Sequence, residues 1–435
     1  MSTEIQQPAD AEADEMAAHA AEVAAPDVIA NSLGEYARIW LSRVRGGESG
    51  ALPVILGLGA IVAYFQIRTS LFLSAGNLVN LMSQAAWIVT LGMAEVFVLL
   101  LGEIDLSIGY SSAMGAVITL WMVSPGNHFP WWIAALAGLA VPAVYSAVQA
   151  VLITRLRAPS FVVTLGGLLM GEGLLLFLIN NAAPNSGGII RLPATNVLYY
   201  IENSNVNPAA DWVIMAAAVV LSGIAFWVRD SRRRASNLAA PPASVTALKI
   251  AVMAVAGVII VLIGNTNRGR FVTAVRGLPW VVLVVTVLLI AWSVLLGRTR
   301  FGRYVYAIGG NAEAARRSGI NLTRVRVLAF GLCGLTAGLM GIILASQQGG
   351  MSTNVNGGQN VLYAVAAAVI GGTSLFGGRG RMLGALLGGL IVAVIYNGLS
   401  LLGLGDAAQY MWTAAVLLAA VAVDTLARRR RPDQT

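Results

Sequence analysis

The sequence predicts an all-α, polytopic membrane protein with about twelve transmembrane helices. Of its 435 residues, 57% are hydrophobic and only 11% are charged. A soluble domain carries about 25% charged residues, so this chain has too little polar surface to cover a water-soluble globule. Its mean hydropathy is +0.76, and its apolar residues form runs that approach the roughly 20 residues a helix needs to cross a bilayer.

Twelve apolar runs justify the helix count. They predict helices near residues 51–66, 78–100, 108–123, 131–153, 161–180, 212–228, 247–264, 279–297, 327–346, 360–377, 382–402 and 408–427. Several of these runs are shorter than about 20 residues. If 247–264 and 279–297 formed a re-entrant pair, the count would fall to ten, and both counts remain open.

Glycine pairs four residues apart are candidates for close helix crossings. The pairs are Gly334/Gly338, Gly384/Gly388 and Gly167/Gly171. Small residues let two helix backbones approach closely in lipid, where burying one apolar side chain against another gains little. A chain with 48 glycines also contains such pairs by chance, so both interpretations are kept.

Arginine placement predicts the orientation of the chain. With twelve spans, six basic clusters fall on the same side of the membrane as both termini, which the positive-inside rule identifies as the cytoplasm. These clusters are Arg38/Arg43/Arg45, Arg155/Arg157, Arg229 with Arg232–Arg234, Arg298–Arg326, Arg379/Arg381 and Arg428–Arg431. We therefore expect a multi-pass protein of the bacterial plasma (inner) membrane with both termini in the cytoplasm. The net charge of +8 is explained by this rule and indicates no nucleic-acid partner.

Five segments are expected along the chain. Residues 1–45 form an acidic, disordered tail followed by an interfacial helix or a linker. Residues 46–230 form the first half of the membrane domain, 231–290 an inserted hydrophobic segment and 291–427 the second half. Residues 428–435 form a basic cytoplasmic tail.

The residue types exclude several kinds of chemistry. Cys333 is the single cysteine and there are two histidines, so a metal site is not expected. The single lysine, Lys249, is not part of a G-x-x-x-x-G-K-[ST] loop, so we expect no cofactor and no ATP bound by this chain.

Two short stretches suggest an internal repeat with broken helices. LGEIDLSIG at 101–109 and IGGTSLFGG at 370–378 each follow an apolar run, pairing Gly102 with Gly371 and Asp105 with Ser374. Transporters often place glycine-broken helices at equivalent positions of two related halves. The candidates for pathway or gating residues are Glu103, Asp105, Ser107, Gly371, Gly372, Thr373, Ser374 and Asn397.

The carboxylates of the first stretch have two open interpretations. Glu103 and Asp105 either lie at the solvated cytoplasmic edge, with Asp105 or Ser107 capping the next helix, or take part in the pathway. Glu95 and Glu172 lie deeper in apolar runs, and their roles are left open. Two polar loops, 181–211 and 347–358, are expected outside, as a partner surface or as passive connections.

Residues 309–327, GGNAEAARRSGINLTRVRV, predict a short cytoplasmic helix between two spans. Asn311 is a good N-cap and Gly319 a plausible stop just after the C-terminus. Glu313 in the first turn and Arg316 and Arg317 near the end suit the helix dipole. Ala314 and Ala315 give the helix a small face that fits a groove of a partner, although a basic loop that only obeys the charge rule remains an alternative.

The same stretch carries a resemblance to a known family. Glu313-Ala314-Ala315-x-x-x-Gly319 is similar to the EAA-x-x-x-G motif of ABC importer permeases. Together with GEIDLSIG, VIGGTSLFGG and GRYVYAIGGN, it resembles the ribose/xylose/branched-chain amino acid permease superfamily, and D-xylose permeases in particular. The resemblance extends over residues 50–427. Val361-Leu362-Tyr363 and Tyr396 depart from common family patterns, which leaves the sugar undetermined.

The resemblance implies a family of partners. A permease of this kind pairs with a second permease copy, is driven by a cytoplasmic ABC ATPase and receives sugar from an extracytoplasmic sugar-binding protein. The helix over 311–319 then corresponds to the coupling helix that contacts the ATPase. The expected function is the permease subunit of an ATP-driven importer for a monosaccharide, D-xylose or a related pentose, and not an enzyme. The alternative is a stand-alone, ion-coupled secondary transporter, which would use Glu95 or Glu172 to bind protons.

Overall fold

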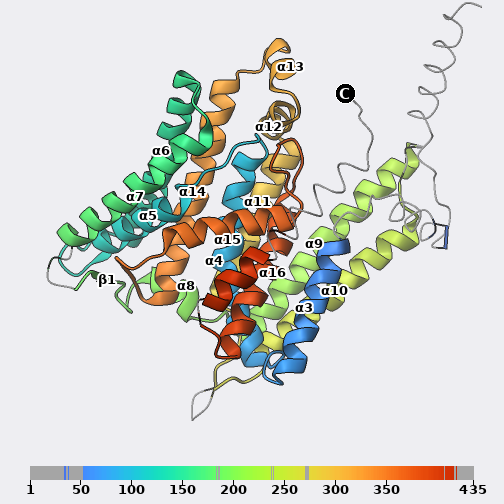
Figure 1. Cartoon of the computed structure of the whole chain (residues 1–435). Helices are drawn as coiled ribbons and strands as arrows, with labels where there is room; N and C mark the ends of the chain where they lie inside the picture. Colours follow the sequence, from blue (N-terminus) through green and yellow to red (C-terminus); the bar gives the residue numbers. More distant parts are fainter. Residues whose placement is uncertain are drawn as a thin grey trace, which may run out of the picture. The chain divides into compact units, whose positions relative to one another are not determined.

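The chain divides into two compact units (Figure 1). The structure is a computed structural model that describes residues 34, 35, 38, 52–182, 184, 187–236, 238, 240–269, 274–405, 407–415 and 418. Unit 1 contains the described residues between Trp212 and Ile260, with positions 34, 35 and 38, and unit 2 contains the rest. Apart from these three positions, the predicted tail and interfacial helix of 1–45 lie outside the described residues, as does the basic tail 428–435.

Unit 2 is built almost entirely from helices, which confirms the predicted fold class. Its α-helices are α3 (Leu52–Arg68), α4 (Ala75–Leu99), α5 (Ile108–Val123), α6 (Trp131–Leu156), α7 (Ser160–Ala182), α8 (Tyr200–Asn203), α11 (Trp280–Arg298), α12 (Arg300–Gly310), α13 (Ala312–Arg317), α14 (Leu322–Gln348), α15 (Gly357–Ile370) and α16 (Met382–Leu401), with a 3-10 turn η1 at Val197–Tyr199. Residues 407–415 are also helical. The predicted run 360–377 was too long, because α15 ends at Ile370 and a glycine-rich turn follows.

Eight helices of the described part are long and apolar enough to cross a membrane. They are α4, α6, α7, α11, α14 and α16 of unit 2 together with α9 (Pro208–Ala235) and α10 (Ala243–Asn265), which form the hairpin described below. Three shorter apolar helices, α3, α5 and α15, have 17, 16 and 14 residues and fall below the roughly 20 that span the hydrocarbon core. The chain is therefore a multi-pass membrane protein, while the count of twelve spans is not confirmed.

Helices α4 and α14 form the centre of unit 2. Both are largely buried, and α14 packs against α4, α5 and α6. The crossing of α14 and α6 depends on two glycines. A Cβ atom added to Gly334 would lie 2.1 Å from the carbonyl oxygen of Pro142, and one added to Gly338 would lie 2.7 Å from that of Gly138. The predicted pair therefore marks a true close approach of two backbones.

A two-stranded antiparallel sheet joins the two loops that were expected outside. Strand β1 (Ile189–Arg191) pairs with β2 (Gly350–Ser352), with Ile190 opposite Met351. The N–H of Leu192 donates to the carbonyl oxygen of Gly349 and extends the pairing. Loops 181–211 and 347–358 thus form one connected surface instead of two independent connections.

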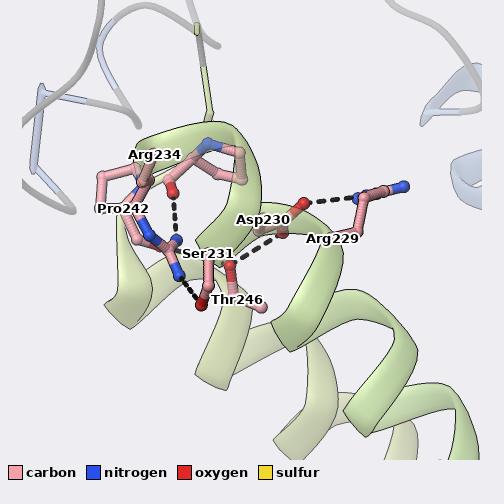
Figure 2. Close-up of polar contacts among 7 residues, drawn as sticks. Arg229, Asp230, Ser231, Arg234, Pro242 and Thr246 are labelled. Atoms are coloured by element: carbon pink, nitrogen blue, oxygen red, sulfur yellow. Dashed lines mark hydrogen bonds and ion pairs between the residues drawn. The ribbon is translucent and has the colours of Figure 1, made fainter. Parts of the chain in front are cut away.

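Unit 1 is an α-helical hairpin made from most of α9 and α10 (Figure 2). Near the turn, the buried Asp230 carboxylate accepts hydrogen bonds from Thr246 Oγ1 at 3.0 Å and from Arg229 Nε at 2.9 Å. Arg234 donates to the carbonyl oxygen of Pro241 at 2.8 Å and to Ser231 Oγ at 3.1 Å. These bonds fix the turn between two helices whose apolar faces are mostly exposed, as expected of surfaces that contact lipid.

Candidate functional site

Two broken helices have the same local conformation, as the predicted repeat requires. Helix α4 ends near Gly102, which has φ +77°, and α15 ends near Gly372, which has φ +88°. In both cases the next N–H, of Glu103 or Thr373, donates back into the last helical turn, at 3.1 Å to Val98 O and 3.0 Å to Ala368 O. The left-handed conformation at both ends is one that glycine adopts without strain. The conformation pairs Gly102 with Gly372, so the predicted pairing with Gly371 was one residue off; Gly371 has φ −68°.

Asp105 and Ser374 use their side chains alike, although the register that pairs Gly102 with Gly372 places Leu375 opposite Asp105. Asp105 Oδ1 accepts a hydrogen bond from the N–H of Ser107 at 2.9 Å. Ser374 Oγ accepts one from the N–H of Phe376 at 3.0 Å. Both side chains therefore close a turn over two residues, which is a characteristic use of Asp and Ser. Ser107 is the N-cap of α5 but its side chain makes no capping hydrogen bond to the helix.

The loop after α4 and the loop after α15 contact each other and the end of α12. The N–H of Gly378 donates to the carbonyl oxygen of Leu100 at 2.9 Å. A Cβ atom at Gly309 would lie 1.8 Å from that carbonyl oxygen and 2.4 Å from Gly378 N. Tyr306 Oη also donates to the carbonyl oxygen of Gly380 at 2.8 Å. The segment that leads into α13 is thus packed directly on both broken helices.

Helix α13 has the capped structure that its sequence predicts. Asn311 Oδ1 accepts from the N–H of Ala314 at 2.9 Å. At the other end Gly319 has φ +84°, and the N–H of Ile320 donates to Ala315 O at 3.1 Å. This is a Schellman closure, in which a left-handed glycine satisfies the last carbonyl groups. The short helix is therefore fixed at both ends.

The surface of α13 is charged and exposed, except at one alanine. Glu313 Oε1 lies 2.8 Å from Arg316 and 3.2 Å from Arg317, and all three side chains are exposed. These two arginines lower the pKa of Glu313. Ala315 is buried against the rest of unit 2, whereas Ala314 is exposed. The helix is held by its neighbours through Ala315 and leaves its charged face free to meet a partner.

An ion pair links the first broken helix to α14. Glu103 Oε1 lies 2.7 Å from Arg326 Nε, in the second turn of α14, and their side chains are 9% and 29% exposed. Burial raises the pKa of Glu103, and Arg326 opposes this rise. Two interpretations were left open for Glu103 and Asp105, and the solvated edge disagrees with the structure, because both residues are buried. The reason is tertiary: Arg326 of α14 lies against Glu103, and Ser146 of α6 lies against Asp105.

A buried polar network surrounds Asp105. Its Oδ2 accepts from Ser146 Oγ at 2.9 Å and its Oδ1 from Ser107 Oγ at 2.6 Å. Gln149 Nε2 donates to Ser107 Oγ at 2.8 Å, and the N–H of Asp105 donates to Glu95 Oε1 at 3.2 Å. The network joins α4 and α6 to the loop between α4 and α5. Sequence reasoning missed Ser146 and Gln149, because their spacing from Asp105 carries no local signal.

Asn397 does not lie near the loops that follow α4 and α15. It forms a reciprocal pair with Asn77, with amide distances of 2.9 and 3.0 Å, and its Nδ2 also donates to Gln84 Oε1 at 3.0 Å. Asn77 and Gln84 belong to the half of α4 that lies away from Gly102. Glu172 is half-buried on α7 beside Tyr110. Thr373 Oγ1 is buried and meets no hydrogen-bond partner among the described residues.

The arrangement suits transmission of movement better than bond chemistry. In the described ranges, no three His, Cys, Asp or Glu side chains lie close enough to hold a metal ion. The exposed helix α13, its support α12 and the two broken helices form one continuous set of contacts. Force applied to α13 would therefore reach the turns that end α4 and α15.

Comparisons with known proteins identify the family. A family model described as "Branched-chain amino acid transport system / permease component" matches residues 77–421, more than half of the chain. The chain is 34% identical over 395 residues to the xylose transport system permease protein XylH of Escherichia coli (strain K12), which covers 88% of this chain and 96% of that protein. It is 32% identical to the protein of the same name from Haemophilus influenzae, over 87% of this chain and 96% of that one. The ribose import permease protein RbsC of Escherichia coli (strain K12) is 28% identical over 89% and 95%. No solved structure matches the chain. The predicted resemblance is thus confirmed, and the chain belongs to the family of branched-chain amino acid transport system permease components.

Proposed function

We propose that this chain is the permease subunit of an ATP-driven importer for a monosaccharide, D-xylose or a related pentose. The relatives named above are xylose and ribose permeases, and they match the chain over nearly its whole length. That likeness is the observation that carries the proposal. The permease itself is not an enzyme; ATP is hydrolysed by a partner subunit.

Helix α13 contacts the ATPase in this proposal. Its caps at Asn311 and Gly319 hold it rigid, and Glu313, Arg316 and Arg317 remain exposed. An isolated helix of six residues would not be stable in water. The support it receives from α12 and α14 therefore favours a docking element over a passive loop.

The remaining assembly follows from the same proposal. A second copy of the permease completes the sugar pathway, and the chain lies in the bacterial inner membrane with both termini in the cytoplasm. An extracytoplasmic sugar-binding protein delivers sugar to the surface formed by β1, β2 and their loops. This surface lies near α8, at the end of α14 opposite to α13 (Figure 1).

Replacing Glu313 with alanine tests the coupling role. Exposed ion pairs contribute little to stability, so the variant should fold and insert normally. We expect ATP-driven sugar uptake to fall at least about tenfold, and the ATPase to be recovered poorly with the purified permease, because the docking face loses its charge pattern.

Ser318→Ala is the matched control, since the exposed Ser318 hydroxyl bonds only to the Ala314 carbonyl oxygen in the described structure. It should keep uptake and assembly. If Glu313→Ala retains both as well, α13 is not the coupling element. Uptake by the purified permease alone, without ATP, and its loss in Glu95→Gln would instead favour the ion-coupled alternative.

A further inference from the structure

Three aromatic side chains from three different helices meet inside unit 2. The Trp87 ring of α4 lies 5.9 Å from the Tyr363 ring of α15 and 6.3 Å from the Tyr396 ring of α16, between centroids. The two tyrosine rings are 6.4 Å apart and inclined at 80°. We call these three residues the aromatic cluster. Edge-to-face rings of this kind leave polarised C–H edges and electron-rich faces available in one small volume.

The amide groups of Asn77, Gln84 and Asn397 contact one another on α4 and α16, two of the three helices that form the aromatic cluster. Gln84 and Trp87 are three residues apart on α4 and so share a face, while Tyr396 and Asn397 are neighbours on α16. The reciprocal bonds of Asn77 and Asn397 join the helices. Amides both donate and accept hydrogen bonds, so they can exchange these bonds for bonds to hydroxyl groups at little cost.

A second chain of polar groups leads from the aromatic cluster toward the loop before α15. Gln359 Nε2 donates to Tyr363 Oη, and Tyr410 Oη donates to Gln359 Oε1 at 3.0 Å. Asn356 Nδ2 then donates to Tyr410 Oη at 2.9 Å, and Asn356 is exposed. Neutral hydrogen-bonding groups therefore continue from the surface to the aromatic rings.

A buried carboxyl group lies beside this region. Glu202 belongs to α8, and the Ser83 hydroxyl of α4 is near it, one turn before Trp87 on the same face. Both carboxyl oxygens of Glu202 are buried, and the Ser83 hydroxyl is the side-chain group that interacts with them in the described chain. Its backbone is held in place, since its N–H donates to Ser346 Oγ at 3.2 Å. A carboxyl group offers more acceptor positions than one hydroxyl can fill, so the buried Glu202 can bind a further hydroxyl group.

We propose that the aromatic cluster, Gln84, Asn397 and Glu202 form a binding subsite for a neutral monosaccharide within the membrane domain. The proposal rests on the function proposed above and assigns residues to it. Because the subsite lies toward the end of α4 that is remote from α13, it occupies the outer part of the pathway. The ring faces would cover the C–H face of the sugar, the amides would bind its hydroxyls, and the Glu202 carboxyl would accept from one of them.

The helix contacts explain how such a subsite can be both closed and functional. Trp87 and Tyr363 are 5% and 2% exposed, so the present conformation has no room for a sugar between them. Separation of α4 from α15 and α16 would open the cluster. The inner ends of α4 and α15 lead into the two loops that pack against the end of α12. Because α12 leads directly into α13, the proposed movement of α13 acts on two walls of the subsite.

The experiment compares uptake of three aldopentoses, D-xylose, L-arabinose and D-ribose, which differ only in the orientation of their hydroxyls. It uses the complete transporter, with Tyr363→Phe and Glu202→Gln as test variants. Each removes one hydrogen-bonding property and keeps the size of the side chain. We expect the ratio of kcat/KM values between the best and the poorest sugar to change at least about threefold, with assembly with the ATPase unchanged.

Trp292→Phe is the matched control. Trp292 makes a similar edge-to-face contact with Phe97, at 5.5 Å and 83°, and donates to Thr336 Oγ1 at 3.1 Å. A purely structural role of the subsite residues would lower uptake of all three sugars equally, as the control should. Sugar ratios that stay at the wild-type values in both test variants would overturn the subsite alone. Wild-type transport of none of the three pentoses would overturn the proposed function as well.

Discussion

At the scale of single residues, buried carboxyl groups determine how the broken helices are held. Glu103 follows the left-handed Gly102 and forms an ion pair with Arg326 of α14. The two carboxylate oxygens of Asp105 accept hydrogen bonds from Ser107 and Ser146. A buried charge is expensive unless it is paired and hydrogen-bonded. These partners therefore explain why acidic residues can lie inside so apolar a protein.

Glu103→Gln should destabilise the folded protein by about 1–3 kcal/mol, because Arg326 loses its partner in a largely buried place. The quantity to measure is the thermal unfolding of the permease in detergent at neutral pH. Arg317→Gln is the control, since it removes an ion pair whose members are both exposed and should therefore cost much less stability than Glu103→Gln. Equal effects of the two changes would show that the Glu103–Arg326 pair has no special weight.

Glu202 predicts a pH dependence with a definite sign. Burial raises its pKa to about 8 from an ordinary value of 4.5, and the nearby Ser83 hydroxyl opposes the rise only in part. The folded state thus keeps a proton that the unfolded state releases above 4.5. The contribution of this group to stability is fully present below the unfolded pKa and is lost as pH rises to about 8.

Thermal unfolding of the wild type between pH 6 and 9 should therefore show stability falling until about pH 8, and Glu202→Gln should flatten this part of the profile. Glu313→Gln is the control. The pKa of Glu313 is lowered by Arg316 and Arg317, so its effect on stability lies below its ordinary value and leaves the slope between pH 6 and 9 unchanged. A Glu202→Gln profile with the wild-type slope would contradict the prediction.

At the scale of helices, small residues decide where backbones meet. Helix α14 crosses α6 at Gly334 and Gly338, where the neighbouring carbonyl oxygens leave no room for a side chain. One turn earlier, a Cβ at Gly331 would meet Ala143 O and Ala147 Cβ at 3.9 Å, which is ordinary contact. The same helix therefore contains a tight position and a permissive one.

Gly334→Ala should lower the stability in detergent by about 1–3 kcal/mol, because the added methyl group forces the two helices apart. Gly331→Ala should be neutral or slightly stabilising, since alanine favours a helix by about 1 kcal/mol over glycine. Intrinsic fluorescence during heating measures both. A Gly334→Ala protein as stable as Gly331→Ala would show that the crossing is looser than this structure indicates.

At the scale of the whole molecule, α14 connects the two surfaces that the proposed function assigns to opposite sides of the membrane. It begins next to α13 and ends next to α8, with Asn203 Nδ2 donating to Ser346 O at 2.8 Å. At 1.5 Å per residue, its 27 residues extend about 40 Å, enough to cross a bilayer.

The single, fully buried Cys333 allows the orientation to be measured. In a Cys333→Ala background, Ser318→Cys beside α13 should react with a membrane-impermeant maleimide only from the cytoplasmic side. Asn354→Cys, in the loop after β2, should react only from the outside. Both positions are exposed. The reverse pattern would place α13 outside the cell and exclude contact with a cytoplasmic ATPase.

Much of the local structure could be predicted because it depends on neighbouring residues. Apolar runs predicted most helices of unit 2 but not α8 or α12, and α5 has the predicted bounds. The cap at Asn311 and the stop at Gly319 followed from residue types at helix ends. The helix predicted over 360–377 was wrong from Gly371 onward, because the apolar residues around Gly371 and Gly372 gave no sign of a turn. The number of membrane spans could not be predicted from the sequence either. Short apolar helices give the same run of apolar residues as a span but are not long enough to cross a bilayer.

By itself, the sequence determined most of the helices, the short helix at 311–319 with its two ends, and the family. Only the tertiary structure decided the partners: Arg326 for Glu103, Ser146 for Asp105, and the meeting of Trp87, Tyr363 and Tyr396. The physical reason is that capping and helix formation act over a few residues, whereas helix packing joins residues far apart in the chain. Helices that are apolar on all sides carry little periodic signal for which face turns inward, so these contacts follow from packing alone.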